Sequence, residues 1–314
     1  MTRIATPAEN NLMLFYMQQN RTQLDLLNGQ IATGIQSETY AGIAPQASHL
    51  VDFQAQSARQ QDFVDTINTV STRMQTMDLP LGEIQSEVQS FRALLPNGAF
   101  NDAQPDIAQQ AKLLLQQVAG YLNTQDGTRY VFAGTSATTP PVDLSQLPTG
   151  AAANLTTPVN GAPASGGYYA GGDAVPPVRI DQQVTVDYGI TANDAATFEP
   201  IIRVLNYLAN NGPFSSSDTT AQANITTAGQ MLDQALQNLT DMRGKLGLQE
   251  QQLNTSLKVH QSAQNIAENG VSSIETVDQA TVITQLQTLE TQMEASFSAT
   301  SQITKLSLVN YLTQ

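Results

Sequence analysis

A regular heptad repeat in the last third of the chain constrains the fold more than any other sequence feature. The repeating positions are Ile225, Leu232, Leu239, Leu246 and Leu253, which alternate with Ala228, Ala235, Met242, Gln249 and Ser256. An apolar period of seven residues is typical of an α-helix that packs along its length against another helix. We therefore predict about five heptads of continuous helix here, with Gly244 and Gly247 tolerated inside it.

A second apolar stripe of the same kind lies in the first third of the chain. Its members are Ile67, Val70, Met74, Met77, Leu81, Ile84, Val88 and Phe91. Pro80 lies inside the stripe, and a proline removes one backbone donor and clashes with the preceding turn. Because the spacing does not slip across Pro80, we predict one kinked helix, with a new helix capped by Asp78 as the alternative. The two stripes together form the predicted core of a helical rod.

Both chain ends carry helical apolar patterns. The first helix has its stripe at Met13, Met17, Leu24, Leu27 and Ile31, and "GIQSETYAGIAP" (34–45) interrupts it. The last helix has its stripe at Val282, Leu286, Leu289, Met293 and Phe297. Beyond Phe297 the apolar residues share no single face: they are Ile303, Leu306, Leu308, Val309, Tyr311 and Leu312. A helix that is apolar all round must be buried all round, so we predict that the two terminal helices pair and that other subunits cover their remaining faces.

The middle of the chain has a different composition, rich in Gly, Ala, Pro and Thr. "VRIDQQVTVDYG" (178–189) alternates like a half-buried strand, and "YVFAG" and "GGYYAGG" are shorter strand candidates. A helix is expected from Ile107 to Tyr121 with Gly127 as its stop, and a short helix follows Phe198.

The predicted fold class is α+β: an elongated, mainly α-helical coiled-coil bundle built from both chain ends, with a small β-rich insertion domain in the middle. Three domains are expected. The terminal helices, 1–40 plus 270–314, form an inner axial domain. Residues 41–130 plus 200–269 form a helical rod, and 131–199 form an outer β-rich insertion.

Composition and motifs exclude several functions. The net charge of −14 and the pI near 4.3 disfavour nucleic acid and anionic membranes as partners. Cys is absent, so no disulfide is needed. The N-terminus lacks a secretory signal pattern, and no apolar run approaches the length of a membrane-spanning helix. His49 and His260 have no ligand-spaced neighbours, and no phosphate loop or nucleophile motif occurs. We expect no enzyme activity, no cofactor and no metal.

The C-terminal sequence "SSIETVDQATVITQLQTLETQMEASFSATSQITKLSLVNYL" resembles that of the bacterial flagellin family. The similarity includes I-E-x-V-D at Ile274, Glu275, Val277 and Asp278, then L-x-x-L-E-x-Q-M-E-A-S and the terminal L-S-L-x-N-Y-L. "LLNGQIATGIQSETYAG" is similar to the family's turn after the first helix, although "YAGIAPQAS" replaces the acidic pair that often follows. "LNTQDGTRYVFAGTSATTPPV" and "YYAGGDAVPPVRIDQQVTVDYGITANDAATFEPIIRVLNYL" resemble the family members at the hook–filament junction.

This resemblance implies a structural, extracellular subunit of the bacterial flagellum, exported unfolded through the type III apparatus without a cleaved signal peptide. The implied partners are further copies in a tubular assembly, hook-associated protein 1 on the hook side, flagellin, and an export chaperone. Flagellin itself, the main filament subunit, is the alternative. A coiled-coil adaptor or a type III needle-tip protein is the more distant one.

Overall fold

The structure is a computed structural model that describes the backbone of residues 5–96, 106–175 and 177–312 and the side chains of 11–96, 106–175 and 177–302. The chain divides into two compact units. We call Met1–Gln60 with Ser262–Gln314 the terminal unit, and Gln61–Gln261 the central unit. Two long helices, α2 (Ala47–Leu94) and α5 (Thr219–Glu275), contribute residues to both units.

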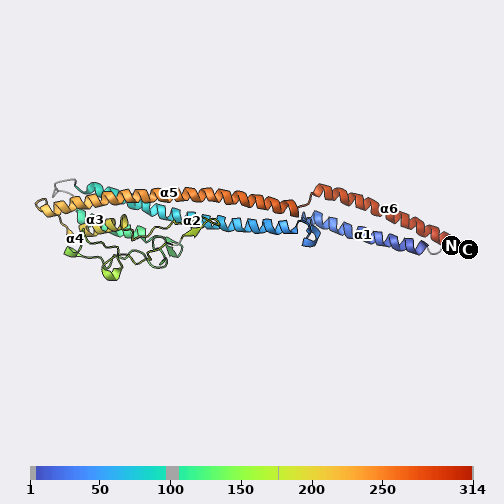
Figure 1. The fold of residues 1–314 in the computed structure, drawn as a ribbon, viewed down its shortest axis with the longest axis horizontal. Coiled ribbons are helices and arrows are strands. Elements are labelled where there is room, and N and C mark those ends of the chain that lie inside the picture. Colours follow the sequence, from blue (N-terminus) through green and yellow to red (C-terminus); the bar gives the residue numbers. More distant parts are fainter. Residues whose placement is uncertain (1–4, 97–105, 176, 313–314) are drawn as a thin grey trace. The chain divides into compact units, whose positions relative to one another are not determined.

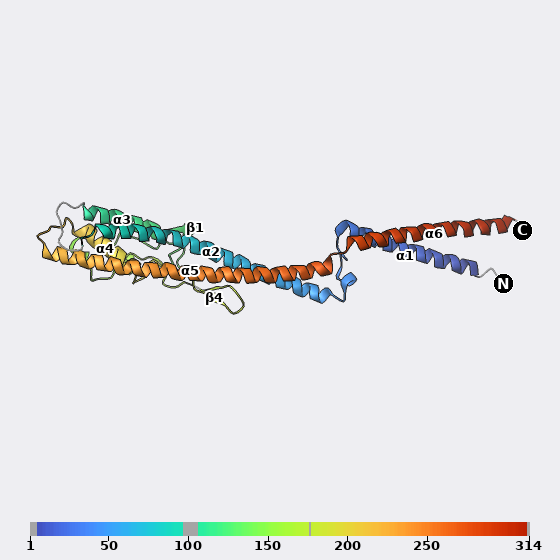
Figure 2. The ribbon, with the colours of Figure 1, turned by 90° about the horizontal axis from the view of Figure 1, so that it is seen from above.

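The terminal unit is built around two helices from opposite chain ends. α1 (Ala5–Thr33) and α6 (Gln279–Leu312) lie side by side (Figures 1 and 2). α1 ends where Gly34 adopts a φ of 72°, a left-handed conformation that glycine takes without steric cost. A short helix, η1 (Tyr40–Ile43), precedes α2. The interruption of the helical pattern predicted at 34–45 is therefore confirmed.

The central unit contains an antiparallel pair formed by α2 and α5. Gln75 donates to the Glu250 carboxylate and Gln85 to the Thr240 hydroxyl, each at 3.1 Å, so the two helices run in opposite directions. α2 continues through Pro80 as one helix, which confirms the prediction of a single helix. Asp78 begins no helix; its carboxylate instead accepts two hydrogen bonds from Arg243 of α5, at 2.8 and 3.0 Å.

Both predicted rod stripes lie in one continuous core. The buried side chains are Ile67, Val70, Met74, Met77, Leu81, Ile84, Val88, Phe91, Ile225, Leu232, Leu239, Leu246 and Leu253. α3 (Ile107–Leu122) and α4 (Phe198–Asn211) pack on each other and extend the same core. The Asp106 carboxylate caps α3 by accepting from the backbone N–H of Gln109.

The predicted stop of this third helix was wrong. α3 ends at Leu122, because the Asn123 backbone N–H closes the last turn and the Asn123 side chain binds both backbone groups of Val142. Gly127, with a φ of 61°, lies instead in the turn between strands β1 (Gln125–Asp126) and β2 (Arg129–Tyr130).

The insertion contains less strand than its sequence predicts. The expected strand over 178–189 is a hairpin of β3 (Val178–Arg179) and β4 (Thr185–Val186). The Asp181 carboxylate accepts a hydrogen bond from the Gln182 backbone N–H, and Arg179 donates to the Asp181 carbonyl. Such local bonds favour a turn over the hydrogen-bond ladder of a longer β-hairpin. "YVFAG" contributes only Tyr130 to a strand, and "GGYYAGG" only a bridge at Tyr169.

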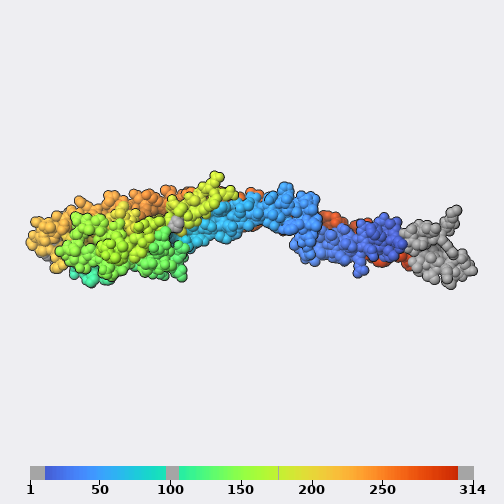
Figure 3. Space-filling view, turned by 60° about the horizontal axis from the view of Figure 1, so that its bottom comes forward, coloured from blue at the N-terminus to red at the C-terminus, as the bar shows by residue number. Residues whose placement is uncertain are grey.

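The rest of the insertion is irregular chain with two short turns of helix, η2 (Gly150–Ala152) and η3 (Pro163–Ser165). Its large buried side chains include Phe132, Tyr168 and Ile180, and the Tyr168 hydroxyl donates to the Ala192 carbonyl at 2.8 Å. The insertion covers one side of the helices of the central unit (Figure 3). The predicted class, mainly helical with a small β-containing insertion, is confirmed.

Candidate functional site

The candidate site is the surface of the α1–α6 pair, because the predicted interface residues gather there. Leu27, Val282 and Leu289 are buried between the two helices, with Leu24, Ile31 and Leu286 packed partly against them. Closer to the chain ends, the Thr300 hydroxyl of α6 donates to the Met13 sulfur of α1 at 3.4 Å. The stripes of the two terminal helices therefore face each other along much of their length.

The line of contact between α1 and α6, which we call the seam, becomes more exposed toward the chain ends. Met13, Met17 and Met293 are only partly buried, and Phe297 is 53% exposed. The remaining predicted residues, Ile303, Leu306, Leu308, Val309, Tyr311 and Leu312, lie outside the described side chains, although α6 includes their backbone. One partner helix thus leaves large apolar side chains of this seam in contact with solvent.

Several exposed apolar residues on the outer faces of the pair lie off the predicted stripes. Each is between 42% and 59% exposed: Leu12, Leu14, Phe15, Tyr16, Leu26 and Ile283. Phe15 and Tyr16 stack edge to face, with ring centroids 5.9 Å apart. The signal was present in "LMLFYM" (12–17), where six consecutive apolar residues occupy every face of the helix. Large clusters of this kind mark surfaces that bind other proteins.

The joint between α5 and α6 explains why its sequence motif combines apolar and acidic residues. Ile274 packs with Ile43 and Leu50, whereas the Glu275 carboxylate accepts from the Gln54 side-chain amide at 3.0 Å and the Glu275 backbone carbonyl accepts from the Gln36 N–H at 2.6 Å. The Asp278 carboxylate accepts from the Ala280 N–H and the Thr281 hydroxyl at the start of α6. These bonds to the charged form, the Thr281 side chain foremost, lower the pKa of Asp278.

No chemistry-bearing cluster accompanies these surfaces in the part of the chain that the structure describes. No group of three His, Cys, Asp or Glu side chains could hold a metal ion there. His49 is exposed, and His260 is buried, stacked on Phe63 and hydrogen-bonded to the Ile180 carbonyl at 2.9 Å. None of the described helices has the length and hydropathy needed to span a bilayer.

A family model decides the nature of the C-terminal part. Residues 230–312 match the bacterial flagellin C-terminal helical region. This segment is similar to that region of flagellins. The matched segment contains most of α5 and all of α6, so the part of the chain that is similar to flagellins supplies one side of the apolar seam with α1. The resemblance to flagellins at this end of the chain is confirmed.

Solved structures give similarities over more of the chain than this flagellin C-terminal helical region. A protein described as a flagellar hook-associated protein from Vibrio parahaemolyticus superposes with a TM-score of 0.59 at 15% identity, covering 75% of this chain and all of that one. FlgL from Bacillus cereus superposes with a TM-score of 0.48 at 16% identity, and the match covers 67% of this chain and 99% of that one. Flagellar hook-associated protein 3 from Legionella pneumophila superposes with a TM-score of 0.44 at 14% identity, and the match covers 75% of this chain and 99% of that one. No curated protein matches significantly. The first of these similarities establishes a shared fold.

Proposed function

We propose that this protein is a structural subunit of the bacterial flagellum, located where the hook joins the filament. The observation that carries the proposal is the α1–α6 pair, in which α6 is the end of the segment similar to flagellins and large apolar side chains remain uncovered. Burial of apolar area drives protein association, and Phe15, Tyr16 and Phe297 are large enough to contribute strongly to it.

The exposed residues favour assembly with several neighbours. Leu14, Phe15 and Tyr16 are all more than half exposed and point in different directions around α1, since each residue turns a helix by about 100° and the three together span about 200°. Phe297 lies on the opposite helix. An isologous dimer uses one patch on each copy, whereas surfaces in several directions suit heterologous contacts that continue around a ring or along a tube.

Junction placement, rather than bulk filament, is supported by the fold shared with the hook-associated protein from Vibrio parahaemolyticus. It is also supported by the resemblance of segments 122–142 and 168–208 to junction proteins. In this role the subunit contacts further copies of itself, hook-associated protein 1 on the hook side and flagellin on the other. Delivery would use an export chaperone and the type III export apparatus, without a cleaved signal peptide. The work of such a subunit is mechanical, and no catalytic residue is assigned.

The test removes the exposed apolar surface and leaves the α1–α6 seam intact. Phe15→Ser combined with Tyr16→Ser should leave the unfolding temperature of the monomer nearly unchanged, because both rings are more than half exposed. In cells that lack the native gene, this double variant should fail to support filaments on hooks, counted by electron microscopy. The control is Gln18→Ser with Gln19→Ser, which changes two exposed polar residues on the same helix. Normal filament numbers with the Phe15/Tyr16 variant would contradict the proposal.

Copy number separates the junction role from the alternative, flagellin. A junction subunit should be a trace component of sheared flagella, whereas a filament subunit should dominate them. Quantitative mass spectrometry of sheared flagella measures this directly. A soluble adaptor or a needle-tip protein would be absent from the preparation altogether.

A further inference from the structure

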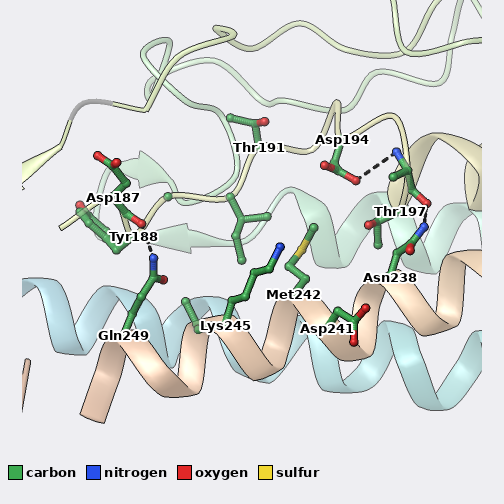
Figure 4. A pocket seen from close by; sticks show the side chains of 14 residues that line it. Asp187, Tyr188, Thr191, Asp194, Thr197, Asn238, Asp241, Met242, Lys245 and Gln249 are labelled. Carbon is green, nitrogen blue, oxygen red and sulfur yellow. Dashed lines mark hydrogen bonds between the residues drawn. The ribbon is translucent and has the colours of Figure 1, made fainter. Parts of the chain in front are cut away.

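A pocket lies in the central unit, whereas the surfaces proposed for assembly belong to the terminal unit. It has a volume of about 390 Å³ and lies between the chain at 187–197 and one face of α5 (Figure 4). Pockets for small molecules usually measure about 300 to 1,000 Å³. This one therefore has room for a small ligand.

Two opposite charges face the pocket from its two walls. Lys245 extends from α5 toward the chain above it, and Asp194 approaches from that chain (Figure 4). One Asp194 oxygen accepts from the Ala196 N–H at 3.2 Å, which leaves the carboxylate able to accept further bonds. Among the residues that the structure describes, Lys245 has no ion pair and no hydrogen bond. Both charges can therefore bind a ligand.

A buried hydroxyl gives a third polar contact. Thr197 is 1% exposed and lines the same pocket, yet its side chain makes no capping hydrogen bond to α4. A hydroxyl has one donor and two acceptor positions, so the Thr197 side chain can bind a polar ligand atom in the pocket.

Apolar side chains form part of the pocket lining. Leu246 is 4% exposed, and Ile190 and Met242 are half-buried beside it. They can pack against the apolar atoms of a ligand.

We propose that this pocket binds a small zwitterion of the α-amino acid class. The ligand carboxylate pairs with Lys245, its ammonium group pairs with Asp194, and Thr197 adds a hydrogen bond. Asp187 and Asp241 also line the pocket, so its four charged side chains, three Asp and one Lys, sum to −2 and disfavour a simple anion. Lys245 in turn repels a simple cation, and only a ligand with both charges satisfies both walls. This inference is independent of the assembly role.

The test titrates the full chain in dilute solution and follows its amide signals by NMR. Glycine is the zwitterionic probe, and acetate and ethylamine each carry one of its charges, with ionic strength matched by NaCl. Glycine should give saturable shifts at residues 187–197 and 238–249, with a dissociation constant on the order of 1 mM. Acetate and ethylamine should each bind at least about tenfold more weakly than glycine, because each lacks one of the two charged contacts.

Variants separate binding from a folding defect. Lys245→Gln should weaken glycine and acetate about tenfold and strengthen ethylamine, because it removes an attraction for one charge and a repulsion for the other. Lys258→Gln is the matched control: it removes the same charge from an exposed site on the same helix, outside the pocket, and should leave all three affinities unchanged. No saturation by glycine would overturn the proposal, and so would equal weakening of all three probes by Lys245→Gln.

Discussion

Glu199 is a carboxylate held inside the central unit, and it shows how one residue links the insertion to α4. It is 2% exposed, accepts from the Val159 N–H at 3.0 Å, and lies 3.3 Å from the Arg203 guanidinium. Burial disfavours its charged form more than these two contacts favour it, so the pKa of Glu199 is raised. The burial of Glu199 beside Val159 therefore lowers the free energy of unfolding by an amount that depends on pH.

The first residue-scale prediction concerns this pH dependence. Because the folded pKa lies above the unfolded value of about 4.3, the folded state binds more protons, and Glu199 lowers stability as pH rises through that interval. Glu199→Gln cannot titrate, so the unfolding free energy of the wild type should fall relative to the variant as pH rises above about 4. Urea unfolding at a series of pH values measures the difference. A difference that stays constant, or that grows in favour of the wild type, would contradict the assignment.

Asp278 has the opposite behaviour, since its pKa is lowered by bonds to its charged form at the start of α6. A lowered folded pKa means that its stabilisation is present above the unfolded value of about 3.9 and is lost as pH falls through the folded one. Asp278→Ala should therefore loosen the first turn of α6 at neutral pH and have little effect at strongly acidic pH. Amide exchange at Ala280 and Thr281 reports this locally. Asp278→Ser, which retains an N-cap oxygen, is the control and should restore most of the protection.

At the scale of elements, helices were predicted better than strands for a physical reason. Leu232 and Leu239 recur every seven residues because they lie on the face of α5 that packs along the core, and that period is visible in the sequence alone. The hairpin at 178–186 depends instead on distant groups. Ile180 is held by His260 of α5, and Tyr188 by the Arg73 guanidinium of α2 at 3.1 Å. These contacts join residues that are 80 and 115 positions apart in the sequence, so no local sequence pattern reveals them.

The candidate site was predictable in part for the same reason. Leu27 and Leu289 follow the helical stripe and meet each other's helix in the seam. Leu14 and Tyr16 lie off the stripe, so the periodicity that identified the seam assigned them to the solvent side. Side chains that neighbouring molecules would cover, as proposed for these two, follow no period set by the fold of one chain. A test for apolar residues on all faces, as applied to the C-terminal tail, would have identified them.

An element-scale prediction compares two leucines that flank Pro80 on α2. Leu81 is fully buried, whereas Leu79 is 71% exposed. Leu81→Ala should lower the unfolding free energy by about 2 to 5 kcal/mol, because it loses buried apolar contact and leaves a cavity. Leu79→Ala should change the unfolding free energy by less than about 0.5 kcal/mol. Urea unfolding of the two variants gives both values, and a similar loss for the two would mean that α2 faces α5 differently.

At the scale of the whole molecule, the two units differ greatly in how much core they contain. The central unit has a continuous core drawn from α2, α3, α4, α5 and the insertion. Among the described residues of the terminal unit, two small clusters are buried: one around Leu27, Val282 and Leu289, the other around Ile43, Leu50 and Ile274. Few buried contacts give a low free energy of local opening. The terminal unit should therefore be the less stable part of the isolated chain.

Amide hydrogen exchange tests this difference and its link to assembly. In the dilute monomer, amides of α1 and α6 near Leu27 and Leu289 should exchange much faster than those of α5 near Leu232, because the seam has few buried side chains and open outer faces. Assembly should slow exchange in α1 and α6, since anything that binds only the folded form stabilises it by mass action. Assembly should change exchange near Leu232 little, because that core is complete within one chain.

The Phe15→Ser with Tyr16→Ser variant should keep the fast monomer exchange under assembly conditions, whereas exchange in the Gln18/Gln19 control should be slowed like that of the wild type. Equal protection of both units in the monomer would mean that the seam is stable without neighbours, and the exposed apolar faces would then need another explanation.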